Sequence, residues 1–422
     1  MNFRFSASRG LPAIVLTTSL LFSGETFAAG FALNDLSMTG AGRAYAGAGI
    51  VGDDYSAIGF NPAGVTLKGS GAQAGLALIW EHGQVKGYAT KNVGGVDRIV
   101  SGKKDISIPV AAPNMFTQYK LNDSLYFGVG VYAPLGLATK YDRDWFGSDF
   151  GVDSELEAID IAPTLGYKLN DHWSFGASLI ARYGKLKMTN TSNTTGYSDF
   201  DIDGWNVYGR FGVMYEHDKD TRIGLSYSTV STEVEHTLKG DHTLTGLGPL
   251  SGKYVGGTIT RLPEIWLLSG YHRHGDFGYS ASVRYTRWEY FNDFTLTSSR
   301  IRFNTSKYNW HNVWSAALGV DWYYNDIWTF RAGLGYDESP VRGASTRTVR
   351  IPDNNRVLMS VGFTYKINDH VKMDFGYTHL YLPTYKARNG YSNTGGAVTH
   401  KDLDAKYDFN AEVIGIQFQY DF

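Results

Sequence analysis

The chain ends on a stretch that alternates strictly in side-chain character, Ile414-Gly415-Ile416-Gln417-Phe418-Gln419-Tyr420-Asp421-Phe422. Its even-numbered residues are large and apolar or aromatic, whereas the odd-numbered ones are glycine, glutamine or aspartate. Because successive side chains of a strand point to opposite faces, the stretch predicts a strand with one apolar and one polar face. A soluble sandwich would bury the apolar face in its core, and a membrane barrel would turn it toward lipid. This stretch alone leaves both architectures open.

Six short polar turns, spaced about 50 residues apart, divide the chain upstream of this strand. Asn, Asp and Gly suit such turns because they tolerate positive φ or hydrogen-bond to their own backbone. An interval of this length is too long for one hairpin, so it must hold two strands and a long connection on the opposite side. Bacterial barrels have short periplasmic turns and longer external loops, so six turns predict fourteen strands. The turns lie at 120–123, 168–171, 217–220, 273–276, 324–326 and 366–369.

Composition favours the barrel over a soluble chain of 422 residues. Glycine is abundant at 50 residues, aromatic residues make up 15%, and cysteine is absent, which excludes disulfides and thiolate metal sites. A net charge of −2 argues against nucleic acid as a partner, which calls for a basic face. The mean hydropathy of −0.25 fits a barrel, since lipid-facing and lumen-facing residues average out.

The first 28 residues are interpreted as a cleaved signal peptide. Arg4 and Arg9 provide the positive start, 11–22 is a short apolar stretch, and small residues surround the expected cleavage site after Ala28. About a dozen apolar residues cannot cross roughly 30 Å of hydrocarbon as a helix. No later segment has about 18 consecutive apolar residues, so membrane-spanning helices are excluded and the expected location is the Gram-negative outer membrane.

Residues 29–70 do not follow the strand repeat and are expected to form a plug, or hatch, inside a barrel formed by 71–422. The stretch 40–49 is rich in glycine and alanine, which allow close packing in a lumen. Its glycine spacing breaks the dinucleotide fingerprint, and no strand-turn-helix context surrounds it. A barrel of fourteen strands without a plug would leave an aqueous hole.

A set of short motifs, in a consistent order, covers nearly the whole chain after residue 28. With them the chain resembles FadL-type outer-membrane transporters of long-chain fatty acids and other hydrophobic compounds, a family of fourteen-strand barrels with a hatch. The motifs are Ala29-Gly30-Phe31, Gly42-Arg43-Ala44-Tyr45, Asp53-Asp54, Asn61-Pro62-Ala63, Pro113-Asn114-Met115, Gly136-Leu137-Ala138-Thr139, Trp173-Ser174-Phe175-Gly176, Leu262-Pro263-Glu264-Ile265-Trp266, Trp328-Thr329-Phe330-Arg331, Asp337-Glu338-Ser339-Pro340 and Ile351-Pro352-Asp353.

The resemblance implies passive uptake, with capture from outside, a pocket beside the mature N-terminus and lateral exit at a kink in the third strand. It implies that the hatch motif Asn61-Pro62-Ala63 sits against this kink and takes part in gating. The third strand itself supports a kink, because proline cannot donate to a ladder and internal glycine often marks a bulge. The kink residues are Gly128, Gly130, Pro134 and Gly136, although Pro134 could instead begin the external loop.

The ligand pocket is expected to include Phe31 and Leu33, near the mature N-terminus, with ordinary hatch packing as the alternative role. The resemblance implies a cationic partner for a fatty-acid head group, but the corresponding positions are Asn190 and Ser306. Lys307 is the candidate after a one-residue shift, which reverses its facing on a strand. Arg182, Lys185 and Lys187 are further candidates, with lumen lining as the alternative. These departures leave fatty acids and aromatic hydrocarbons both open as substrates.

Three other functions are compatible with an outer-membrane barrel and compete with hydrophobic uptake. A polar-solute porin is opposed by the plug, and an enzyme is opposed by scattered histidines without a zinc-binding helix motif, so neither catalysis nor a cofactor or metal is expected. Adhesion or phage reception through external loops is compatible with transport. Expected partners are hydrophobic small molecules, outer-membrane lipid and lipopolysaccharide, and the barrel assembly machinery through Phe422, for a chain expected to be monomeric.

Overall fold

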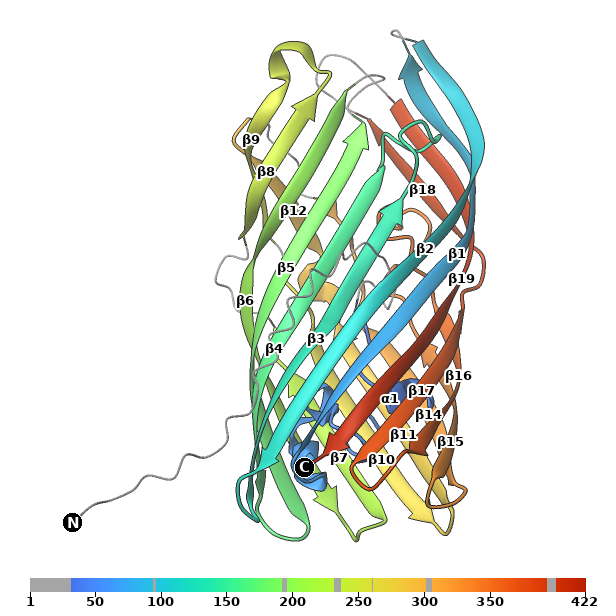
Figure 1. Cartoon of the computed structure of the whole chain (residues 1–422). Helices are drawn as coiled ribbons and strands as arrows, with labels where there is room; N and C mark the ends of the chain where they lie inside the picture. The colour runs from blue at the N-terminus through green and yellow to red at the C-terminus, as the bar shows by residue number, and fades with distance from the viewer. Residues whose placement is uncertain are drawn as a thin grey trace, which may run out of the picture.

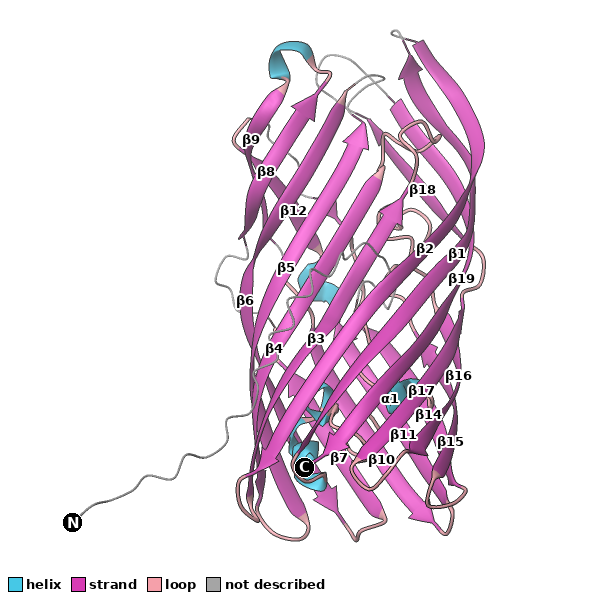
Figure 2. Cartoon of the chain, in the orientation of Figure 1, coloured by secondary structure: helices cyan, strands magenta, loops and turns pink. Residues whose placement is uncertain are grey.

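The computed structural model describes residues 32–93, 96–191, 196–230, 237–259, 261–300, 306–392 and 400–422. The predicted signal peptide and Phe31 lie outside these residues, as does the side chain of Asn190. Within them the fold is a closed antiparallel β-barrel (Figures 1 and 2). The strand segments are β1 (Gly71–Val93), β2 (Val96–Lys120), β3 (Leu125–Lys140), β4 (Asp153–Lys168), β5 (Trp173–Thr191), β6 (Tyr197–Glu216), β7 (Thr221–Ser228), β8 (Thr237–Thr245), β9 (Gly252–Ile259), β10 (Glu264–His274), β11 (Phe277–Arg287), β12 (Asp293–Ser298), β13 (Ser306–Lys307), β14 (Val313–Tyr323), β15 (Trp328–Asp337), β16 (Arg356–Lys366), β17 (Val371–Tyr381), β18 (Tyr385–Ser392) and β19 (His400–Asp421).

These segments form fourteen barrel strands, as the turn count predicted. Five strands are interrupted, and each of these consists of two segments: β7 with β8, β9 with β10, β11 with β12, β13 with β14, and β17 with β18. Each strand pairs antiparallel with its neighbour in sequence. The ring closes where β1 pairs with β19, from Gly71 opposite Asp421 to Ala89 opposite Leu403.

The six predicted turns all join neighbouring strands at one end of the barrel, and asparagine organises four of them. The Oδ1 of Asn122 accepts hydrogen bonds from the backbone N–H groups of Ser124 and Leu125. Asn170, Asn325 and Asn368 accept equivalent pairs of bonds. This local side-chain bonding explains why the turns were readable from sequence.

The predicted two faces of the last strand are confirmed in β19. Ile414 is 45% exposed and Phe418 47% on the outer surface, whereas Gln417 and Gln419 are buried on the inner one. The inner glutamines bond to Asp374 of β17, with Nε2 to Oδ2 distances of 2.9 and 2.7 Å. A sandwich is therefore excluded, since the apolar face points away from the protein interior.

Residues 32–70, here called the N-terminal segment, pack against the inner side of the ring. The segment contains α1 (Met38–Ala41), α2 (Ala57–Phe60) and the 3-10 helix η1 (Pro62–Leu67). Helix α1 contacts β16, β17 and β19, and η1 contacts β3 to β6, which lie elsewhere around the ring. Two further 3-10 helices, η2 (Gly248–Leu250) and η3 (Trp288–Phe291), belong to connections between barrel strand segments. None of the helices in the described part of the chain is long and apolar enough to span a bilayer.

Wall glycines allow this close approach. A Cβ added to Gly333 would lie 2.2 Å from the backbone carbon of Arg43, and one added to Gly176 would lie 2.2 Å from that of Pro62. Glycine is the residue that permits such backbone contact in a strand. The backbone of the N-terminal segment can therefore pack directly against the wall at these glycines, because they have no side chains.

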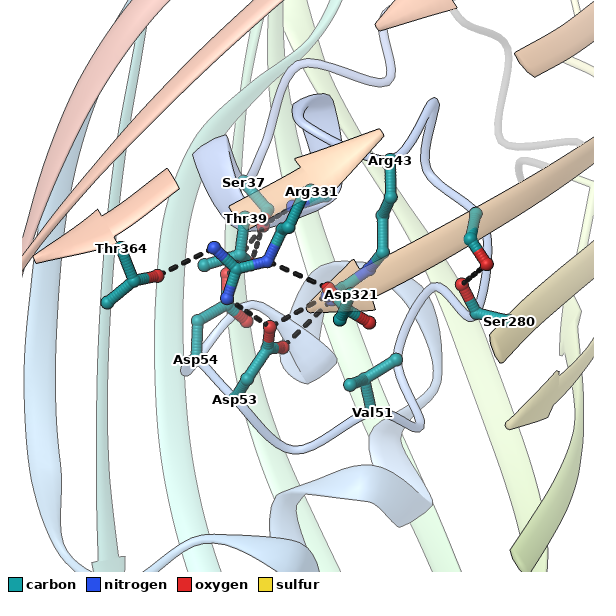
Figure 3. Close-up of polar contacts among 12 residues, drawn as sticks. Ser37, Thr39, Arg43, Val51, Asp53, Asp54, Ser280, Asp321, Arg331 and Thr364 are labelled. Atoms are coloured by element: carbon teal, nitrogen blue, oxygen red, sulfur yellow. Dashed lines mark hydrogen bonds and ion pairs between the residues drawn. The ribbon is translucent and has the colours of Figure 1, made fainter. Parts of the chain in front are cut away.

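A buried charge network also joins the segment to the wall (Figure 3). The guanidinium of Arg43 lies 2.8 Å from Asp53 in the segment and 3.0 Å from Asp321 on β14. Arg331 on β15 lies 3.0 Å from the same two carboxylates. These pairs hold the pKa of Asp53 well below its usual range, against the effect of burial. Breaking one member would leave an uncompensated buried charge, which typically costs about 3–5 kcal/mol.

Candidate functional site

The barrel wall is interrupted between β2 and β3. The two strands pair only from Lys120 opposite Tyr126 to Asn114 opposite Tyr132. Beyond that point β2 continues to Val96 against β1 alone, and β3 continues to Lys140 against β4 alone. The β2–β3 boundary therefore has no hydrogen-bonded rungs over the half of the wall nearer the long connections, which is called here the wall interruption (Figure 1).

A bulge in β3 marks the start of the wall interruption. The register between β3 and β4 shifts by one residue between Tyr132 and Leu135, a stretch that includes Pro134. Proline has no N–H to donate, so it fits the unpaired position of a bulge. Pro134 thus lies inside the strand and does not begin the external loop. Gly136, farther along, is paired again with Glu157 of β4.

The N-terminal segment reaches this bulge from inside. Ala32 bridges Leu135, and the backbone N–H of Leu33 donates to the carbonyl of Pro134 at 2.8 Å. At the neighbouring rung, Asn114 is buried, and neither atom of its side-chain amide has a hydrogen-bond partner among the described residues.

The motif Asn61-Pro62-Ala63 lies beside β5 to β7. The Asn61 side chain is buried, accepts from the N–H of Ala63 at 3.0 Å and donates to the carbonyl of Val213 at 3.4 Å. The wall glycines that meet this motif are Gly176, Gly212 and Gly224.

On β3 the contact is different. A Cβ added to Gly128 or Gly130 would lie 2.7 or 2.9 Å from the side chain of Ile58. Ile58 of α2, rather than the three-residue motif itself, is thus the side chain of the N-terminal segment placed closest to the β3 glycines. The gating role of Asn61, Pro62 and Ala63 stays a prediction.

An apolar cavity, called the outer cavity, lies in the half of the barrel near the long connections. It has about 840 Å³ of empty space, its mouth included, within the range usual for small-molecule sites. Its apolar lining comes from β3 to β6, from the interrupted strands and from one loop: Leu135, Leu137, Leu156, Leu186, Met188, Trp205, Leu238, Leu262, Phe291, Phe294, Tyr308 and Ile351.

Arg350 brings a positive charge into this cavity. It belongs to the connection between β15 and β16, and its guanidinium donates to the carbonyls of Asp153 and Thr189 and to the Ser154 hydroxyl at 2.7–3.2 Å. Within the described residues no carboxylate lies within ion-pair distance of it. Burial lowers the pKa of Arg350 to about 10. A half-buried cation that is hydrogen-bonded only to neutral groups favours an anionic ligand.

A second cavity, called the inner cavity, lies against the N-terminal segment and has about 790 Å³ of empty space, with its mouth included. Leu135, Arg182 and Leu262 line both cavities and form their common boundary. Arg182 is itself neutralised, with its guanidinium 2.6 and 2.8 Å from the two carboxylate oxygens of Asp160. The inner cavity also touches Tyr132 and Pro134, so it borders the wall interruption.

Some of the site residues proposed from sequence line the two cavities, and others do not. Leu33 and Pro134 line the inner cavity, and Arg182 lines both cavities. Lys307 lines neither: its side chain is 77% exposed, and its Nζ lies 3.9 Å from Asp293. Lys185 is likewise absent from both linings and lies 3.4 Å from Asp201, and Lys187 lines neither cavity.

Sequence reasoning missed three arginines that line the cavities: Arg210, Arg284 and Arg350. Arg350 directly precedes the Ile351-Pro352-Asp353 motif, and that proximity was the available signal. Arg210 and Arg284 lie on strands with alternating apolar residues, so inward facing was readable but cavity lining was not. The described residues include no cluster of three His, Cys, Asp or Glu that could hold a metal ion. The arrangement is chemically suited to bind an amphiphile with an anionic end.

Comparison with known proteins agrees with this architecture. A family model described as outer membrane protein transport protein (OMPP1/FadL/TodX) matches residues 19–422. The long-chain fatty acid transport protein of Escherichia coli O6:H1 (strain CFT073) is 29% identical over 446 aligned positions, covering 95% of this chain and 96% of the relative. The 47 kDa outer membrane protein of Pasteurella multocida (strain Pm70) is 27% identical, covering 96% and 98%.

Solved structures show the same fold. The crystal structure of a Pseudomonas aeruginosa FadL homologue has a TM-score of 0.83 at 24% identity, covering 93% of this chain and all of that one. The Ralstonia pickettii toluene transporter TbuX has a TM-score of 0.68 at 20% identity, covering 92% and 100%. The barrel and these relatives place the chain in the Gram-negative outer membrane. The chain is therefore a member of the OMPP1/FadL/TodX family of outer-membrane transport proteins.

Proposed function

We propose that this chain mediates passive uptake of long-chain fatty acids across the outer membrane. The observation that carries the proposal is the outer cavity, whose lining is mostly apolar. Of its two arginines, Arg182 is paired with Asp160, whereas Arg350 is a half-buried cation with no carboxylate partner among the described residues. An acyl chain gains about 0.8 kcal/mol for each methylene removed from water. The guanidinium supplies charge-assisted hydrogen bonds for the head group. The relatives named as long-chain fatty acid transport proteins support the same substrate class.

The proposed route runs from the outer cavity through the inner cavity to the wall interruption. The common boundary at Leu135, Arg182 and Leu262 makes the two cavities neighbours. The inner cavity borders the bulge at Pro134, where β2 and β3 are no longer paired. Exit at this point would pass the acyl chain directly into lipid, which avoids returning each methylene to water.

The N-terminal segment acts in this proposal as the plug that blocks a straight aqueous path. Its contacts with glycines of β5, β6 and β15 and the charge network around Arg43 support that role. Local rearrangement near Leu33, which bonds to Pro134, would open the inner cavity toward the wall interruption. No energy source is required, because the substrate is more stable in lipid than in water.

The experiment is uptake of labelled oleate by a strain lacking its own fatty acid transporters, with and without this chain. Expression is expected to restore uptake, and mass spectrometry of protein extracted in mild detergent is expected to show bound fatty acid. Normal oleate uptake without the chain, or no restoration with it, would contradict the proposal. A large steady ion current in planar bilayers would favour a polar-solute porin instead.

Aromatic hydrocarbons are the second candidate substrates. The outer cavity includes Trp205, Phe291, Phe294 and Tyr308, whose rings would suit an uncharged aromatic ligand. A structural relative is described as a toluene transporter. Toluene has no charged group that could accept hydrogen bonds from the Arg350 guanidinium, so Arg350 favours a fatty acid over toluene as the substrate. Competition between toluene and oleate for the purified protein distinguishes the two.

A further inference from the structure

We propose that the outer face of the barrel carries a binding site for lipopolysaccharide, the phosphorylated glycolipid of the outer leaflet. The site is a row of lysines that crosses four neighbouring strands, here called the lysine row. It lies outside the lumen, so it is separate from both cavities and from the proposed uptake route. The lysine row consists of Lys103 on β2, Lys86 on β1, Lys406 on β19 and Lys386 on β18.

Strand register is what brings these lysines together. Lys86 lies directly opposite Lys103 of β2 and directly opposite Lys406 of β19. Lys406 in turn lies directly opposite Lys386 of β18. The four strands are neighbours in the order β2, β1, β19 and β18 (Figure 1). Because neighbouring strands are about 4.8 Å apart, the lysine row spans roughly 14 Å.

All four side chains of the lysine row face away from the lumen. Each of the four is exposed. Val85, Ala387 and Tyr407, which are sequence neighbours of three of them, are fully buried on the inner face. Successive side chains of a strand point to opposite faces, so the lysines share the face of lipid-exposed Ile414 on β19. The lysine row is therefore a feature of the outer surface.

The two central lysines of the row have no acid partner. The Nζ atoms of the two lysines at its ends lie 3.2 Å from Asp105 and 3.9 Å from Asp404. Among the described residues, no carboxylate lies within ion-pair distance of Lys86 or Lys406, although Asp408 is exposed on the same face of β19. Like charges directly opposite each other destabilise a sheet. A phosphate bound across Lys86 and Lys406 would neutralise this repulsion.

The height of the lysine row favours lipopolysaccharide over a phospholipid. The continuous run of outward apolar residues ends at Trp80 on β1 and at Ile414 on β19, which marks the edge of the hydrocarbon region. With a rise of about 3.3 Å per residue and a tilt of about 40°, Lys86 lies roughly 15 Å beyond Trp80. Phospholipid head groups extend only about 5–8 Å beyond the hydrocarbon. The phosphorylated sugars of lipopolysaccharide extend farther, to the height of the row.

Two lysines elsewhere on the outer half of the barrel provide a matched control. Lys239 on β8 lies directly opposite Asp203, and the Nζ of Lys253 on β9 lies 2.7 Å from Asp241. Both lysines are exposed and belong to strands outside the lysine row. Lys239→Gln/Lys253→Gln therefore removes two positive charges from the outer half and leaves the lysine row intact.

The first test measures the Kd of fluorescent rough lipopolysaccharide for the purified protein in detergent by thermophoresis. Lys86→Gln/Lys406→Gln is expected to raise the Kd about 25-fold, or about fivefold for each lysine. Lys86→Arg/Lys406→Arg keeps both charges, so this variant and the control are expected to stay within about twofold of the wild type. Equal affinity of the wild type and the glutamine variant would overturn the proposal, as would an equal loss in the control.

The second test separates the phosphates of the glycolipid from other sources of affinity. Lipopolysaccharide stripped of its phosphates is expected to bind the wild type about as weakly as the intact glycolipid binds the glutamine variant. Phosphatidylglycerol is expected to bind both proteins equally. Unchanged affinity after phosphate removal would refute recognition by charge, and an equal loss for phosphatidylglycerol would refute the assignment to lipopolysaccharide.

Thermal unfolding without lipid distinguishes a binding role from a structural one. The glutamine variant is expected to unfold at the same temperature as the wild type or higher, because like-charge repulsion is removed. Added lipopolysaccharide is expected to raise the Tm of the wild type more than that of the variant. A variant that unfolds at a lower temperature without lipid would show that the lysines support the barrel itself, contrary to the proposal.

Discussion

Replacing Arg350 by glutamine tests the substrate class most directly. Arg350 is half-buried in the mostly apolar outer cavity, and its guanidinium donates to two backbone carbonyls and the Ser154 hydroxyl. A hydrogen bond to a charged group contributes about 1.5–3 kcal/mol. Its loss is expected to raise the Kd for oleate by about 10- to 150-fold. The Kd for methyl oleate, which lacks the charge, is expected to stay within about twofold.

The assay is displacement of a fluorescent fatty acid from purified protein in detergent by oleate and by methyl oleate. Arg342→Gln is the matched control, because Arg342 lies in the same connection, is exposed, bonds only to the carbonyl of Asn309 among the described contacts, and lines neither cavity. Heat-dependent migration in electrophoresis confirms that each variant retains a folded barrel.

Two results would refute the reasoning about Arg350. Equal affinity of wild type and variant for oleate would show that the guanidinium does not hold the head group. A parallel loss for oleate and methyl oleate would show that Arg350 acts by fixing its own connection against β4 and β5, where its three acceptors lie. Only a selective loss for the acid agrees with a carboxylate-binding role.

Three further perturbations address the bulge, the N-terminal segment and its anchoring. Gly130→Val places a side chain where even a Cβ would lie 2.8 Å from Phe116, so oleate uptake is expected to fall while the barrel stays folded; unchanged uptake would remove β3 from the exit route. Burial raises the pKa of Asp35 from 3.8 to about 6. The folded state therefore favours protonated Asp35, and this preference adds roughly 3 kcal/mol to the free energy of unfolding. The contribution is fully present below pH 3.8 and is lost as the pH rises through about 6. The protection factors of the amides of residues 32–41, which are exchange rates corrected for the intrinsic pH dependence, are expected to fall over that range in the wild type and to stay constant in Asp35→Asn; constant protection in the wild type would contradict the shift. Arg43→Gln leaves Asp53 with one cationic partner in place of two, and single-channel recordings are expected to show openings that the wild type lacks; identical closed traces would mean that the network does not hold the plug.

Strand number, facing and the tight turns were all determined by local sequence. Alternation with a period of two decides which side chains of β19 face lipid, and it needs no distant partner. The turns are equally local, because asparagines such as Asn122 bond to N–H groups two and three residues ahead. The position of Pro134 likewise predicted an irregular third strand, since proline cannot donate to a ladder.

The site depended on contacts that no local pattern encodes. Arg350 reaches the outer cavity because its connection folds against the ends of β4 and β5, about 160 to 200 residues away in sequence. The resemblance suggested Lys307 after a one-residue shift, but its side chain is 77% exposed, lies beside Asp293 and lines neither cavity. Ile58, not the Asn61-Pro62-Ala63 motif, is the side chain placed closest to the β3 glycines, because the packing of α2 decides which residue reaches them.

By itself, then, the sequence determined that this chain forms a fourteen-strand barrel, because facing and turn chemistry are properties of neighbouring residues. Only the tertiary structure decided where the wall loses its β2–β3 pairing and which arginines line the cavities without an acid partner. The physical reason is that strand register and charge compensation are set by contacts between strands. An arginine that is paired with an acid in the lumen and one that is not can therefore have the same local sequence pattern.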